Sequence, residues 1–119
     1  MAWKRYEIET YEVRLVACNT PGYEPVTAFV YLTWSGSRRA TLWFYRSGDP
    51  LPQNVEVARD KGVEFYARFE QSQFATAIGL LRHEHPVYFH WDSDNCGAFL
   101  GTRQEPVGEH ESSERTSSP

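Results

Sequence analysis

The segment 71-QSQFATAIGLLRHEHPVYFHWD-92 decides the fold, because it predicts one helix followed directly by one strand. Apolar side chains recur in it at the spacing i, i+3, i+4 and i+7, which is typical of one helix face: Phe74, Ala77, Ile78 and Leu81. Ser72 is expected to cap the helix start, since its hydroxyl can accept a hydrogen bond from a free backbone N–H. Pro86 cannot continue a helix and restricts the residue before it, so the helix should end between His83 and His85.

The residues after this proline alternate between two faces, which is typical of a strand over Val87 to Trp91. Other runs of β-forming residues, bounded by turn residues, predict further strands: Tyr6 to Asn19, Val26 to Trp34, Arg39 to Arg46, Val63 to Phe69 and Gly97 to Thr102. The short connections at residues 35–37 and 92–97 predict two antiparallel hairpins. Residues 55–60 give no clear signal for either a helix or a strand.

These elements together predict a single α+β domain over residues 1–103, with an antiparallel sheet of five to six strands and one helix packed on one face. Curling of this sheet toward a barrel is left open by the sequence. Residues 104–119 are polar and acidic, with too few apolar side chains to offset the entropy of ordering them. They are therefore expected to form a disordered acidic tail.

The composition limits the classes of function that the chain can have. Its 119 residues carry a formal net charge of −4, which argues against general binding to nucleic acid or to anionic membranes. No apolar run is long enough to span a membrane, and the first residues lack the apolar core of a signal peptide. We expect a cytoplasmic protein with no membrane partner, in which Cys18 and Cys96 are free thiols and Cys18 is buried.

A second apolar face is the most informative feature of the predicted sheet. One helix can cover one sheet face, and the opposite face of an antiparallel sheet is then normally polar. The opposite positions here carry mostly aromatic side chains beside Arg14, and these are the candidate binding residues: Phe29, Tyr31, Trp43, Tyr45, Tyr66, Arg68, Tyr88 and His90. Large aromatic side chains bury about 150–250 Å² each, so even four half-exposed rings would exceed the apolar patch that monomers normally show.

Three coverings of this aromatic face are compatible with the sequence: closure of the sheet on itself, packing against another protein chain, and binding of a ligand with flat faces. Tyr and Trp at alternate strand positions suit subunit interfaces, so we first expect a homo-oligomer or a protein partner. Single-stranded nucleic acid is the second interpretation, because bases stack on aromatic rings while Arg can bind phosphate. A small-molecule site is the third.

No catalytic or metal-binding pattern stands out in the sequence. His83, His85 and His90 lie close together, but no Cys or carboxylate accompanies them at the spacing of zinc ligands. Residues 92–95 resemble the start of a calcium loop, yet Arg103 occupies the position of the final Glu. Residues 35–39 could contact phosphate, but the stretch is short and a solvated hairpin tip is the better interpretation. The sequence therefore predicts a non-catalytic protein without a metal or cofactor.

Overall fold

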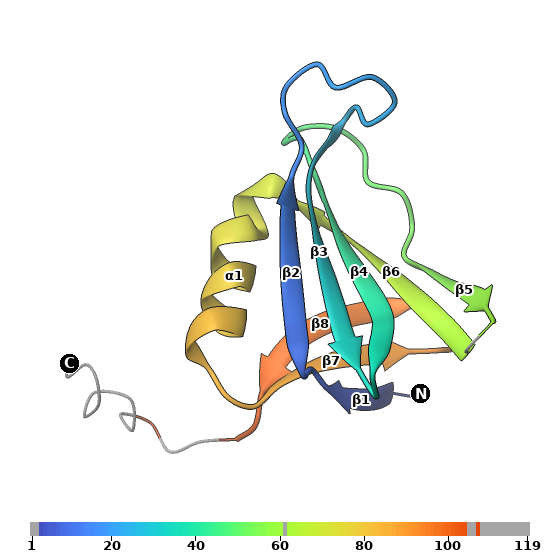
Figure 1. The fold of residues 1–119 in the computed structure, drawn as a ribbon, viewed down its shortest axis with the longest axis vertical. Helices are drawn as coiled ribbons and strands as arrows, with labels where there is room; N and C mark the ends of the chain where they lie inside the picture. The colour runs from blue at the N-terminus through green and yellow to red at the C-terminus, as the bar shows by residue number, and fades with distance from the viewer. Residues whose placement is uncertain (1–2, 61, 105–106, 108–119) are drawn as a thin grey trace.

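A computed structural model of the chain describes residues 3–60, 62–104 and 107, and within them it contains two β-sheets and one helix (Figure 1). In chain order the elements are β1 (Trp3–Glu7), β2 (Thr10–Leu15), β3 (Val26–Trp34), β4 (Ser37–Tyr45), β5 (Val55–Arg59), β6 (Gly62–Glu70), the 3-10 turn η1 (Gln71–Gln73), α1 (Phe74–His83), β7 (Val87–Asp92) and β8 (Gly97–Thr102). The predicted α+β class is confirmed.

The strands form two sheets, so the prediction of one sheet is wrong. The larger sheet has the order β2-β3-β4-β6-β5 and the smaller has the order β1-β7-β8. Every pairing is antiparallel except that of β4 with β6, because the chain first turns back as β5 before it enters β6. Both sheets end in unpaired edge strands over the described ranges, and the alternative of a barrel is therefore also wrong.

The predicted strand from Tyr6 to Asn19 is two strands, because the chain changes sheets in its middle. β1 pairs with β7 in the smaller sheet, whereas β2 pairs with β3 in the larger one. At the change of sheet, the backbone N–H groups of Ile8 and Glu9 donate to the carbonyl oxygens of Val87 and Thr33, each over 2.9 Å. Ile8 is also buried, so its side chain holds the crossing point within the core.

The core lies between the two sheets, whose strands cross each other steeply in Figure 1. On the β3–β4 hairpin, the residues that alternate with the aromatic candidates are all buried: Ala28, Val30, Leu32, Ala40, Leu42 and Phe44. From the smaller sheet, Phe89 and Trp91 pack on Phe65 of the larger one, with ring centroids 5.6 and 4.7 Å away. The face of β7 that alternation predicted to be apolar thus covers the larger sheet.

The predicted helix is present, and its apolar face packs on the same core. Ala77 is buried, and the other predicted residues of this face are partly buried against the core. Phe74 meets Phe44 of β4 edge to face, with ring centroids 5.1 Å apart. α1 ends at His83, as predicted from the proline that follows it.

The prediction that Ser72 caps the helix is wrong, because Ser72 lies inside the 3-10 turn η1, which precedes α1. There its hydroxyl donates to the Glu70 carboxylate over 2.8 Å. The first turn is instead held by a capping box between Glu70 and Gln73. In this arrangement the Gln73 side-chain oxygen accepts the Glu70 backbone N–H over 3.0 Å.

The remaining predictions have mixed outcomes. Both hairpins are confirmed, and of the ambiguous residues 55–60 all but Asp60 form the edge strand β5. Cys18 and Cys96 are free thiols, but Cys18 is exposed because β2 ends at Leu15 and leaves it in a surface loop. The predicted tail falls outside the described residues except for Gln104 and Val107. In the described part of the chain, no helix is long and apolar enough to cross a membrane.

Candidate functional site

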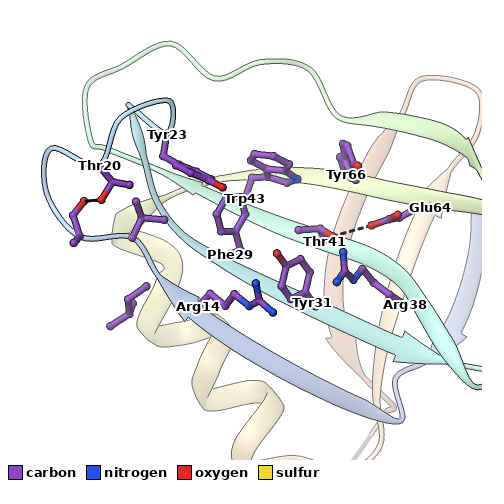
Figure 2. A pocket seen from close by; sticks show the side chains of 13 residues that line it. Arg14, Thr20, Tyr23, Phe29, Tyr31, Arg38, Thr41, Trp43, Glu64 and Tyr66 are labelled. Carbon is purple, nitrogen blue, oxygen red and sulfur yellow. Dashed lines mark hydrogen bonds between the residues drawn. The ribbon is translucent and has the colours of Figure 1, made fainter.

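The face of the larger sheet that points away from the core carries the predicted aromatic side chains. Phe29 and Tyr31 come from β3, Trp43 from β4 and Tyr66 from β6, and Figure 2 shows them on one side of the sheet. Phe29 lies directly opposite Trp43 in the strand register, and their ring centroids are 4.7 Å apart. Trp43 in turn lies 5.4 Å from Tyr66. We call these four rings the outer aromatic face.

A cavity of about 460 Å³ opens on the outer aromatic face. Its walls come from β2, β3, β4 and β6 and from the loop that joins β2 to β3. Tyr23 of this loop points toward Phe29 and Trp43 (Figure 2), and its ring lies edge-on to Phe29 at 5.8 Å. Ligand sites for small molecules typically measure about 300–1,000 Å³. The cavity therefore has the size of a small-molecule site.

Guanidinium groups cover part of the outer aromatic face. Arg38 lies over Tyr31 at 3.9 Å from the ring centroid, and Arg68 lies over Trp43 at 5.0 Å, both within the range of cation–π attraction. Phe29 is 7% exposed, because its neighbours surround it. Tyr31, Trp43 and Tyr66 are half-buried, so the guanidinium groups reduce the apolar surface that the outer aromatic face exposes without covering it completely.

Tyr31 lies between two arginines that have different charge environments (Figure 2). Arg14 lies 5.1 Å from the ring centroid, and its Nε donates to the Glu12 carboxylate over 2.9 Å. This hydrogen bond and the charge of Glu12 raise the pKa of Arg14. Arg38, by contrast, has no carboxylate within ion-pair distance among the described residues. Arg38 therefore brings an uncompensated positive charge to the cavity wall.

Glu64 brings a carboxylate to the wall, where two donors hold it. Thr41 Oγ1 donates to Glu64 Oε2 and Arg59 Nε donates to Glu64 Oε1, each over 3.0 Å. The hydrogen bond from Arg59 to Glu64 raises the pKa of the arginine. Arg59 also donates to the Tyr66 hydroxyl, so the same network fixes one ring of the outer aromatic face.

Tyr45 and Arg68 adjoin the cavity without lining it. Arg68 Nη1 donates to the Tyr45 hydroxyl over 3.0 Å and its Nε donates to the Gln53 carbonyl over 3.2 Å, so both acceptors are uncharged. Beside Arg68, the Trp43 indole N–H is buried and has no hydrogen-bond partner in the part of the chain that the structure describes. A buried donor without a partner costs about 1–3 kcal/mol. The centre of the face thus carries a polar group that is not satisfied.

Tyr88 and His90 lie in the smaller sheet, whereas the outer aromatic face belongs to the larger sheet. The prediction that they share one face with the other candidates is therefore wrong. They lie on β7, on the side of the smaller sheet that faces away from the core. There His90 stacks on Phe99 at 4.4 Å, and Arg5 lies over Tyr88 at 4.3 Å. Burial and the positive charge of Arg5 lower the pKa of His90.

Sequence reasoning missed several residues of the cavity. Thr41 precedes Trp43 by two positions and Glu64 precedes Tyr66 by two, so strand alternation places both on the side of the aromatic candidates, although neither is among the predicted binding residues. Arg38 was expected at a solvated hairpin tip, and it instead extends over Tyr31. The position of Tyr23 depends on the path of a loop, for which the sequence carries no signal.

Comparison of the chain with protein-family models, with curated protein sequences and with solved structures found no match.

Proposed function

We propose that the protein is a small non-catalytic binding protein that holds a flat small molecule in the cavity on its outer aromatic face. The observation that carries the proposal is the cavity itself, about 460 Å³ in volume, with aromatic rings and guanidinium groups in its walls. Ligand sites are typically concave and mostly apolar, with a few polar groups that orient the ligand. The cavity is concave, and its wall combines aromatic and aliphatic side chains with Arg14, Arg38, Thr41 and Glu64.

The shape of the site favours a small molecule over a flat partner surface. A planar ring can enter a concave site and lie against Trp43, whereas a flat protein surface meets only the rim. Each favourable contact between two aromatic rings contributes about 0.5–1.5 kcal/mol beyond the area it buries. A ligand of about 12 non-hydrogen atoms, at roughly 0.3 kcal/mol per atom, would bind in the millimolar range or more tightly.

The state of Glu64 supports a non-catalytic role. A general base must be able to receive a proton from a bound substrate. Both oxygens of the Glu64 carboxylate already accept hydrogen bonds, from Arg59 and from Thr41, and the residue is 7% exposed. This carboxylate is placed to hold the wall of the cavity rather than to react with a ligand.

The proposal is tested with indole-3-carboxylate as the probe and with a matched pair of tyrosine variants. Tyr31 and Tyr88 are both half-buried and both lie under an arginine, at 3.9 Å and 4.3 Å, but only Tyr31 lines the cavity. Tyr31→Ala should weaken binding in calorimetry by roughly fivefold, because a ring of the cavity wall and the support that it gives to Arg38 are lost. Tyr88→Ala should leave the affinity unchanged. Equal losses in both variants would contradict the assignment of the site.

Self-association through the same face is a second candidate, and the rim of the cavity favours it. Leu15 is 75% exposed and Tyr23 is 46% exposed, and both lie at the cavity. A second copy that covered this rim would bury both side chains and produce a homo-oligomer. Light scattering separates the two candidates: a dimer mass for the wild type and a monomer mass for Leu15→Lys would favour self-association.

A further inference from the structure

We propose that the ligand of this cavity is an anion: a planar aromatic ring that carries a carboxylate or phosphate group, with the acidic group bound by Arg38. This inference rests on the proposed function and adds the charge of the ligand and the residue that recognises it. It follows from the pairing of charges in the cavity wall, the position of Arg38 on Tyr31, and the volume of the cavity.

The pairing of charges leaves one positive group in the wall. Arg14 is compensated by Glu12 at 2.9 Å, and Glu64 is compensated by Arg59 at 3.0 Å. Arg38 is exposed and has no carboxylate within ion-pair distance in the described ranges. The wall is therefore positive although the whole chain has a net charge of −4. A site of this kind selects an anionic ligand over a neutral ligand of the same shape.

The position of Arg38 also suits it to bind the acidic group of a ligand. Its guanidinium lies over the Tyr31 ring at 3.9 Å, which leaves the N–H groups at its edge available to a ligand. Guanidinium groups bind carboxylate and phosphate through two parallel hydrogen bonds, and stacking on a ring reduces the freedom that is lost on binding. Arg38 is thus held in place before a ligand arrives.

The aromatic part of the ligand has its own place beside this anion site. The Tyr31 and Phe29 rings are nearly parallel, with an interplanar angle of 3° and centroids 6.2 Å apart. Phe29 in turn contacts Trp43, with ring centroids 4.7 Å apart, so the outer aromatic face extends from Tyr31, beneath Arg38, to Trp43. An acidic group attached directly to a ring, or by a short linker, can therefore reach Arg38 while the ring lies on this face.

The same observations favour a small anion over a nucleic-acid strand. A strand needs a positive groove that follows several phosphates, and its binding weakens steeply with salt. Within the described residues that line the cavity, Arg38 supplies the one uncompensated charge. The volume of about 460 Å³ also suits one small ligand.

The test compares each anion with its neutral counterpart, using calorimetry on the whole chain. Indole-3-carboxylate is compared with indole, and adenosine 5′-monophosphate with adenosine. The first pair tests recognition of a carboxylate and the second tests recognition of a phosphate. At least one anion should bind roughly tenfold more tightly than its neutral counterpart, as a hydrogen bond to a charged group predicts. Arg38→Gln should remove this preference by lowering the affinity for the anion to about that for its neutral counterpart.

The control variant is Arg46→Gln, because Arg46 is an exposed arginine outside the cavity that pairs with Asp49 at 2.8 Å. It should retain the preference for the anion. Equal affinity for the anions and the neutral compounds would overturn the inference and leave the proposed function in place. Absence of binding by all four compounds would overturn both. Much tighter binding of an eight-residue oligothymidylate than of the monophosphate would overturn the small anion in favour of a strand.

Discussion

Replacing Phe89 by alanine tests whether the two sheets pack face to face. Phe89 is fully buried, and its ring lies 5.8 Å from Trp34, 5.6 Å from Phe65 and 6.2 Å from Trp91. Large-to-small changes of a buried Phe cost about 3–5 kcal/mol, because apolar contacts are lost and a cavity remains. Domains of this kind are stable by about 5–15 kcal/mol, so the variant should be marginally folded. Urea denaturation at fixed pH measures the change in the free energy of unfolding.

Phe99 provides the matched control, because it lies on the neighbouring strand of the same sheet but on the opposite face. It is 47% exposed and contacts Trp3 and His90 at the surface. Phe99→Ala should therefore cost about 1 kcal/mol or less. Phe89→Leu, which keeps most of the side-chain volume, should cost about 1–2 kcal/mol and gives a measurable value if the alanine variant does not fold. Similar costs for Phe89→Ala and Phe99→Ala would refute the placement of the core between the sheets.

Three further predictions follow from the same structure. Leu81→Ala should cost about 1–2 kcal/mol in chemical denaturation, below the range for full burial, because Leu81 is only partly buried against the core; a cost near zero would contradict the helix packing. The lowered pKa of His90 means that the unfolded chain binds its proton at a higher pH than the folded protein, so the free energy of unfolding should fall as the pH drops from about 7 to 5. The free energy of unfolding of the His90→Gln variant should fall less over the same pH range. An identical pH dependence for the variant and the wild type would contradict the lowered pKa of His90. Deleting residues 108–119, which contain no large apolar side chain, should leave the melting temperature nearly unchanged in calorimetry; a fall of several degrees would contradict the domain boundary.

The hairpins and strand faces were predictable because their signals are local. Ser35 and Gly36 have positive φ angles of 53° and 81°, which match a tight two-residue hairpin turn. Alternation along β3 and β4 then separates the core side from the aromatic side, and Pro86 sets the end of the helix. Each of these features depends on residues that are close together in the sequence.

The number of sheets and the composition of the cavity depend on contacts between distant residues. Alternation assigns Tyr88 to one face of its own strand, but it does not say in which sheet that strand lies. No glycine or proline marks the change of sheet at Ile8, so the sequence predicts one long strand there. The parallel pairing of β4 with β6 likewise depends on the return of the chain through β5, whose local signal is weak.

The four tryptophan side chains allow the most direct test of the proposed ligand site. Trp43 lines the cavity, Trp34 and Trp91 are buried in the core, and Trp3 is exposed on the smaller sheet. Each indole N–H gives its own NMR signal, so a titration with indole-3-carboxylate reports on all of these places at once. We predict that the Trp43 signal shifts in a saturable manner while the other three remain in place. A shift of the Trp3 signal alone, or saturable binding with no change at Trp43, would contradict the assignment of the cavity as the ligand site.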